Sequence, residues 1–122
     1  MVWPDLPPRW RVGNTDANVW WVVRFLVLYD VPKDPEAFDR HYRDVHIPLA
    51  KKLPGLRRYT ISRDHAPVRG GEPYYLVAEL DWDDMDALRQ AFQSPAGQAT
   101  AQDVANLADG GVRSMVYELE VL

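Results

Sequence analysis

Residues 22–55, VVRFLVLYDVPKDPEAFDRHYRDVHIPLAKKLPG, carry the signals of a strand followed by a helix. The segment 22–29 is short, rich in Val, Leu and aromatic residues, and apolar on both alternating sets of positions. This pattern predicts a strand that is covered on both faces. Asp34 followed by Pro35 predicts a helix start, because the carboxylate caps free amides and proline already has the first-turn φ angle. A strand followed by a helix therefore opens the fold.

The predicted helix runs to about Leu53, and Pro54 with Gly55 ends it. With 3.6 residues per turn, its larger apolar side chains gather on one side. That side is expected to face the sheet and consists of Phe38, Tyr42, Val45, Leu49 and Leu53.

The rest of the chain adds three strands and a second helical region. In chain order these are a strand at 56–63, a hairpin loop at 66–73, a strand at 74–82, a helical region from Asp83 or Asp84 to about Ala108 that Ser94-Pro95 interrupts, and a strand at 112–121. The order β-α-β-β-α-β is the split unit of the ferredoxin-like α+β folds. In such folds an antiparallel four-stranded sheet carries both helices on one face.

The opposite face of this sheet is expected to be bare. Tyr75 and Val77 would place apolar surface there, and a second copy of the same sheet is an economical cover. We therefore predict a homodimer that pairs through the sheet face. Glu79 is expected in this interface as one half of a structural ion pair, with Arg24, Arg58 or Arg63 as the other half.

The first 18 residues differ from the rest, since three of the ten prolines and two of the five tryptophans fall there. This composition predicts an N-terminal arm at 1–18 and one domain at 19–122. Because Trp3 and Trp10 are costly to leave in water, the arm is expected to dock on its own domain or on a neighbouring subunit. A disordered terminus is the alternative.

Composition excludes several function classes. The 122 residues suit a single domain, and the net charge of -4 provides no basic field for nucleic acid. The absence of cysteine excludes disulfides, thiolate metal sites and thiol nucleophiles, and fits a reducing compartment. The longest apolar stretch, residues 19–29, is far shorter than the roughly 20 residues of a membrane-spanning helix. No signal-peptide cleavage site follows it. A cytoplasmic protein without a membrane segment is expected.

His46 is the candidate catalytic residue, because it alone of the three histidines lies near the apolar side of a predicted helix. Pro48 cannot donate a hydrogen bond to the carbonyl of Asp44, so the helix should bend there. Tyr42 lies one turn earlier, where its phenol could assist the imidazole in acid–base chemistry. A core histidine bonded to a freed backbone carbonyl explains the same spacing.

Leu49, Trp82 and Phe92 are the candidate substrate-binding residues, expected to form an apolar pocket around a ring. Aromatic residues at helical spacing are also ordinary core residues. No metal site is expected, because His41 and His46 are five positions apart and would point roughly 140° away from each other on a helix. No phosphate loop or dinucleotide fingerprint indicates a nucleotide cofactor.

Residues 38–50 and 53–59 resemble the EthD family of dimeric α+β barrel proteins, most specifically in the motif Tyr-x-x-x-His-x-Pro-Leu at 42–49. The resemblance continues through 77–80, 94–98 and 103–104. It implies a ferredoxin-like protomer, a dimer whose sheets meet as a barrel, and a pocket between helices and sheet. It also identifies His46 as the motif histidine. Similar proteins act, without metal or organic cofactor, as isomerases or as cyclase-, dehydratase- or oxygenase-like enzymes.

These observations favour a cofactor-independent enzyme that acts on a small cyclic or aromatic carbonyl compound or lactone in the degradation or tailoring of organic compounds. His46 would move a proton and Tyr42 would assist. The main alternative is a non-catalytic protein that binds a small apolar cyclic ligand in the same pocket. Haem binding through His46 is a third possibility, although the second helical region contains no histidine.

Overall fold

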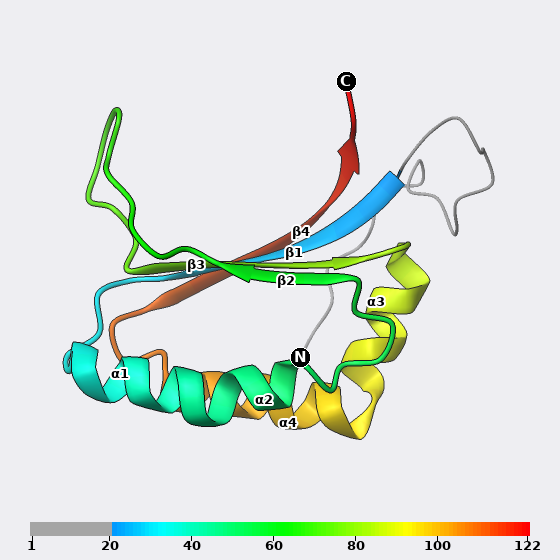
Figure 1. The fold of residues 1–122 in the computed structure, drawn as a ribbon, viewed down its shortest axis with the longest axis horizontal. Helices are drawn as coiled ribbons and strands as arrows, with labels where there is room; N and C mark the ends of the chain where they lie inside the picture. Colours follow the sequence, from blue (N-terminus) through cyan, green and yellow to red (C-terminus); the bar gives the residue numbers. More distant parts are fainter. Residues whose placement is uncertain (1–20) are drawn as a thin grey trace.

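One antiparallel sheet carries the described helices on a single face (Figure 1). The structure, a computed structural model, describes residues 21–122. Its strands are β1 (Trp21–Tyr29), β2 (Arg58–Ile61), β3 (Leu76–Trp82) and β4 (Val112–Glu120). They lie in the order β2-β3-β1-β4, and every neighbouring pair is antiparallel. The predicted ferredoxin-like α+β fold is thus confirmed.

The second layer consists of α1 (Pro35–His41), a π-helical turn η1 (Tyr42–His46), α2 (Ile47–Ala50), α3 (Met85–Gln93), α4 (Pro95–Asp103) and a 3-10 turn η2 (Val104–Asn106). The predicted helix starts are confirmed. Asp34 accepts a hydrogen bond from the amide of Ala37 at 3.1 Å. Asp84, the second of the two candidate caps, accepts one from the amide of Ala87 at 2.8 Å. Ser94 ends α3 and caps α4.

The first helix does not bend simply at Pro48, as predicted, but contains the π turn η1. Pro48 has no amide hydrogen to give to the Asp44 carbonyl. The amide of Ile47 bonds instead to the carbonyl of Tyr42, five residues back. A π turn holds one more residue than an α turn, so the later residues are rotated by about 100° relative to a regular helix.

This rotation corrects the predicted buried face. Val45 was expected to face the sheet but is 39% exposed, and Leu49 is only partly buried. His46 and Ala50, one position later in each case, are buried in their place. Phe38, Tyr42 and Leu53 are buried as predicted.

The core fills the space between the sheet and the helices. Alternate residues of β1 and β3 point into it, and the register pairs Val23 with Trp82, Phe25 with Leu80, Val27 with Ala78, and Tyr29 with Leu76. Trp82 is fully buried, and its indole N–H donates to the carbonyl of Pro54 at 2.9 Å. No helix in residues 21–122 is long and apolar enough to cross a membrane.

The other sheet face carries no helix of the described chain (Figure 1). The guanidinium of Arg24 lies 2.8 Å from Asp81 and 3.6 Å from Glu79, which confirms Arg24 among the predicted ion-pair partners of Glu79. Tyr75, also expected on this face, lies on the helix side instead. Tyr75 precedes β3, so the alternation of side chains between the two faces of that strand does not apply to it. Its ring packs edge-on against Phe38 at a centroid distance of 5.3 Å. The predicted arm at 1–18 lies outside the described residues.

Candidate functional site

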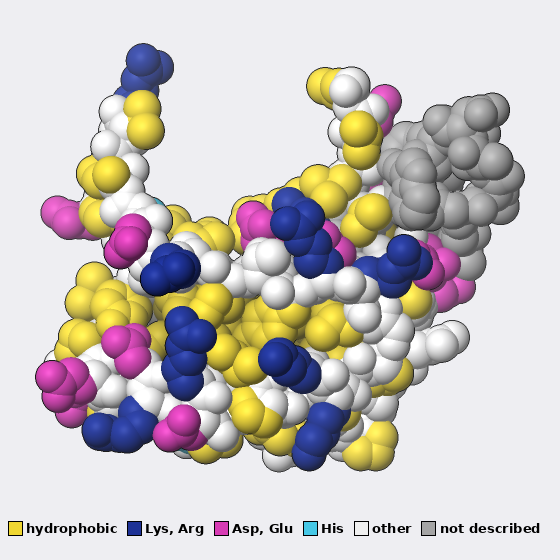
Figure 2. Space-filling view, viewed as in Figure 1, with side chains coloured by type: hydrophobic (Ala, Val, Ile, Leu, Met, Phe, Trp, Pro, Cys, Tyr) yellow, Lys and Arg dark blue, Asp and Glu magenta, His cyan; other side chains and the backbone are white. Residues whose placement is uncertain are grey.

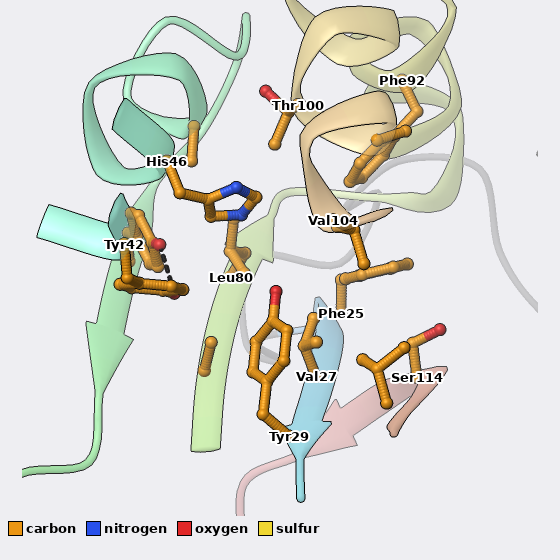
Figure 3. Close-up of a pocket in the computed structure, with 15 residues that line it drawn as sticks. Phe25, Val27, Tyr29, Tyr42, His46, Leu80, Phe92, Thr100, Val104 and Ser114 are labelled. Carbon is orange, nitrogen blue, oxygen red and sulfur yellow. Dashed lines mark hydrogen bonds between the residues drawn. The ribbon is translucent and has the colours of Figure 1, made fainter. Parts of the chain in front are cut away.

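A pocket of about 260 Å³ lies between the sheet and the helices, with His46 in its wall (Figure 3). It is lined mainly by apolar and aromatic side chains from all four strands and from η1, α2, α3, α4 and η2. The lining residues are Phe25, Val27, Tyr29, Tyr42, His46, Ala50, Tyr59, Ala78, Leu80, Phe92, Thr100, Ala101, Val104, Val112 and Ser114. Ser114, on the edge strand β4, is the exposed member of this lining, so the pocket opens toward β4.

The imidazole of His46 is held by a carboxylate from the other helical segment. Its Nδ1 lies 2.9 Å from Oδ2 of Asp103, the last residue of α4. Both side chains are 7% exposed. The ring projects into the pocket (Figure 3), and Nε2 has no hydrogen-bond partner among residues 21–122. A buried imidazole with a carboxylate behind it and a free nitrogen in front is the arrangement of a general base.

Asp103 has two further donors, both at its Oδ1. Nε2 of His41 lies 2.7 Å away, and the amide nitrogen of Asn106 lies 3.0 Å away. The prediction that His41 and His46 point apart is therefore wrong. It assumed a regular helix, whereas the π turn closes five residues and brings both imidazoles to one side.

Electrostatics favour the neutral form of His46. Burial lowers the pKa of His46 below its ordinary value of 6.5, although the hydrogen bond and the charge of Asp103 oppose this change. Burial alone would raise the pKa of Asp103, but hydrogen bonds from Asn106, His41 and His46 together lower it. A carboxylate can only accept, so Nδ1 of neutral His46 carries the hydrogen and Nε2 offers its lone pair to the pocket.

Tyr29, at the end of β1, adds a hydroxyl to the pocket. Its side chain is 1% exposed, and the hydroxyl points toward the pocket volume that the His46 ring also faces (Figure 3). No residue among 21–122 forms a hydrogen bond with this hydroxyl. Burial, and then electrostatic interactions with Tyr59 and Asp103, raise the pKa of Tyr29, so it stays a neutral donor. Such a donor can stabilise negative charge on an oxygen atom.

Tyr42 lies beside His46, as predicted, with ring centroids 5.1 Å apart. Its hydroxyl, however, is 2.6 Å from that of Tyr59 rather than bonded to the imidazole. Burial raises the pKa of both phenols, so both stay protonated. Whichever of the two donates in this pair, the other keeps one O–H that can be offered to the pocket.

The candidate substrate-binding residues separate into two groups. Phe92 lines the pocket, 4.9 Å from Phe25 between ring centroids. Trp82 and Leu49 do not line it. Trp82 is buried behind Phe92, at a centroid distance of 5.7 Å, as a core residue. Leu49 is turned away from the pocket by the π turn, which places Ala50 in the lining instead.

Sequence reasoning missed Tyr29, Tyr59 and Asp103. Tyr29 and Tyr59 stand at inward positions of predicted strands, and this alternation was the signal that could have found them. No helix or strand pattern distinguishes Asp103, because its contact with His46 spans 57 residues, and the signal that could have found it was the family resemblance at 103–104. Residues 21–122 contain no group of three or more His, Cys, Asp or Glu side chains arranged to hold a metal ion.

Comparison with known proteins identifies a family and a similar relative. Residues 32–111 match the model of the EthD domain. An uncharacterized 11.0 kDa protein of Rhodococcus erythropolis, from the thcB-thcC intergenic region, is 35% identical over 99 residues. That alignment covers 81% of this chain and 96% of the relative.

Solved structures share the fold. An ethyl tert-butyl ether D (EthD) family protein from Bacillus halodurans superposes with a TM-score of 0.72 at 34% identity, covering 79% of this chain and 96% of that one. A dimeric protein of unknown function from Bacteroides fragilis, with a ferredoxin-like fold, gives 0.59 at 16% identity over 80% and 96%. SnoaB, a cofactor-independent oxygenase from Streptomyces nogalater, gives 0.50 at 24% identity over 83% and 91%.

Proposed function

Because the chain belongs to the EthD family, we propose that it is a cofactor-independent enzyme that moves a proton on a small cyclic or aromatic compound. His46 is the general acid/base. The observation that carries this proposal is the single orientation of His46. Asp103 holds its Nδ1, and its Nε2 is directed into an apolar pocket.

The pocket suits a compound of one or two rings. A cavity of about 150 Å³ in another protein is large enough for benzene, and this pocket measures about 260 Å³. Phe25, Phe92 and Leu80 supply apolar walls. This volume is below the usual range for small-molecule sites, about 300–1,000 Å³, and so disfavours a macrocycle as large as haem.

The polar groups indicate a carbonyl or lactone oxygen on that ring. Nε2 of His46 takes a proton from a carbon next to the carbonyl, and the electrons of the broken C–H bond move onto the carbonyl oxygen. Tyr29, together with the free O–H of the Tyr42–Tyr59 pair, donates hydrogen bonds to the resulting enolate. Where a C=C double bond adjoins the deprotonated carbon, the enolate extends over it, and protonated His46 then delivers the proton to the far carbon of that double bond, which yields an isomer and restores the neutral imidazole.

SnoaB supports a reaction that needs no cofactor, since this fold carries such an oxygenase. An enolate made by His46 is also the electron-rich species that an oxygenase of that kind would require. Removal of a proton by His46 would therefore be the first step of either an isomerase-like or an oxygenase-like reaction.

Deuterium exchange tests the proposal without knowledge of the natural substrate. The probe is 2-tetralone, a fused two-ring ketone with acidic hydrogens next to the carbonyl, incubated with protein in D₂O. The expected result is faster exchange with the wild type than in buffer, and a loss of about 10²–10⁴-fold in His46→Gln. His65→Gln, an exposed position in the hairpin loop, is the matched control and should behave as the wild type. Saturable binding of 2-tetralone that survives His46→Gln, with no exchange in either protein, would instead identify a carrier or sensor.

The assembly we propose is a homodimer that covers the bare sheet face. The β2–β3 loop and the end of β4 project beyond this face (Figure 1), and hydrophobic side chains lie among charged ones in the hollow between them (Figure 2). Met115, which is 55% exposed, is one of the apolar residues on β4. The dimeric relative from Bacteroides fragilis supports this assembly. The absence of cysteine supports a cytoplasmic location.

A further inference from the structure

His41 contacts the site at a point that the proposed reaction does not use. Its Nε2 lies 2.7 Å from Oδ1 of Asp103, whereas His46 bonds to Oδ2 of the same carboxylate. The side chain of His41 is 30% exposed, against 7% for those of His46 and Asp103. One carboxylate therefore joins an imidazole in the pocket to an imidazole that solvent can reach.

The π turn makes this arrangement possible. His41 ends α1 and His46 ends η1, five residues later. In a regular helix these side chains would point about 140° apart and could not share one partner. π turns are rare and occur frequently at functional sites. Here the π turn interrupts the regular helical hydrogen bonds and lets both histidines contact Asp103.

The three groups are electrostatically linked. Burial raises the pKa of Asp103, whereas hydrogen bonds from Asn106, His41 and His46 and, to a smaller extent, the charge of His41 lower it. Burial has the largest effect on the pKa of His46 and lowers it, the hydrogen bond and the charge of Asp103 raise it, and a positive charge on His41 lowers it by a smaller amount. The reason is that protonated His41 offsets the negative charge that stabilises a protonated His46. Without that charge on His41, the full carboxylate charge acts on His46.

We propose that His41 is a positioning residue for His46, which acts through Asp103. It holds the carboxylate so that Nε2 of His46 faces the pocket, and a positive charge on its ring, 2.7 Å from Oδ1 of Asp103, makes His46 a weaker base. This proposal rests on the proposed function in one respect. The strength of His46 as a base affects the reaction only if His46 moves a proton.

Few other groups can produce this effect. Among residues 21–122, the titratable side chains bonded to this cluster are Asp103 on α4, His46 on η1 and His41 itself. Two phenols also face it, Tyr42 beside the His46 ring and Tyr29 near Asp103, and both stay neutral because burial raises their pKa values. Asn106 on η2 adds an uncharged amide at Oδ1 of Asp103. Removing the charge of His41 while keeping its hydrogen bond therefore isolates its contribution.

Two substitutions make this separation. In His41→Gln the side-chain amide can place an N–H where Nε2 of the imidazole was, but it does not titrate. In His41→Ala both the hydrogen bond and the charge are lost. The readout is the tautomer and the titration midpoint of His46, measured by two-bond ¹H–¹⁵N correlation spectra from pH 5 to pH 9, with His46→Gln and His65→Gln to assign the signals.

The wild type should show His46 as the single Nδ1–H tautomer above its midpoint. His41→Gln should keep that tautomer and shift the midpoint of His46 upward, because a nearby positive charge is gone. His41→Ala should show both tautomers in exchange, and its rate of 2-tetralone exchange should fall about tenfold or more, as is known for outer partners of functional histidines. His41→Gln should restore that rate.

An unchanged midpoint of His46 in His41→Gln would overturn the proposal, and so would an unchanged tautomer in a folded His41→Ala. If His41→Ala does not fold, the midpoint in His41→Gln decides alone. Because the spectra need no substrate, they judge His41 even if His46→Gln leaves exchange unaffected and the proposed function fails.

Discussion

Nδ1 of His46 and Oδ2 of Asp103 lie 2.9 Å apart, although 57 residues separate them in the chain. One residue ends the π turn and the other ends α4, so their contact joins the two helical segments above the sheet. This contact fixes the tautomer of His46 and leaves Nε2 for the pocket. The chemistry of the site depends on how firmly Asp103 is held.

Asp103→Asn tests that dependence. The substitution removes the charge but nearly keeps the shape, so the pKa of His46 should fall further, because Asp103 opposes the effect of burial. The rate of 2-tetralone exchange should fall by about 10–100-fold. Asp64→Asn, in the exposed hairpin loop, is the matched control. Exchange at the wild-type rate in Asp103→Asn would show that Asp103 has only a structural role.

Tyr29→Phe separates a binding role from a structural one. The Tyr29 hydroxyl has no partner in the described chain, so its removal should leave the free energy of unfolding unchanged or slightly higher. Exchange of 2-tetralone should nevertheless fall by about 10²-fold, the lower range for loss of an oxyanion donor.

Tyr42→Phe is the comparison for that variant. It breaks the 2.6 Å bond to Tyr59 and should lower the free energy of unfolding by about 1 kcal/mol. A Tyr29→Phe protein that exchanges 2-tetralone as fast as the wild type would remove Tyr29 from the proposed mechanism.

The stability of the protein should fall on mild acidification because of His46. Its pKa is lowered in the folded state, so the unfolded chain binds a proton near pH 6.5 that the folded chain does not. The stabilisation is complete above pH 6.5 and is lost as the pH falls through the lower folded-state value. Asp103, whose pKa is also lowered, adds a loss below about pH 4.

Urea unfolding at pH 7, 6 and 5 measures this effect. The wild type should lose more free energy of unfolding between pH 7 and pH 5 than His46→Gln does, since glutamine does not titrate. Parallel losses in the two proteins would show that His46 titrates alike in the folded and unfolded states.

If the dimer forms through the bare sheet face, a charge placed on that face should disrupt it, whereas a charge on the helix layer should not. Met115→Asp puts a charge on the bare sheet face and should shift the protein toward the monomer in sedimentation velocity. Val45→Asp makes the same change on the outer side of η1, where Val45 is 39% exposed, and should leave the dimer intact. A wild-type monomer at micromolar concentration would contradict the assembly.

The sequence predicted the fold because strand alternation and helix capping are local signals. The alternating apolar residues of β3 and the caps Asp34 and Asp84 appear as expected. The site was predicted less well. Pro48 indicated a disturbance, but a π turn and a bend follow from the same missing amide, and only the π turn buries His46. The contact with Asp103 depends on how α4 packs, which no local pattern specifies.

Two titrations of the same group test most directly whether His46 is the base. The rate constant for deuterium incorporation into 2-tetralone at saturating concentration, measured from pD 5 to pD 8, should rise as His46 loses its proton. Its midpoint should match, after correction for D₂O, the midpoint of His46 in the ¹H–¹⁵N spectra, and both should lie below 6.5. A rate independent of pD, or one with a midpoint unrelated to that of His46, would contradict the claim that His46 is the base.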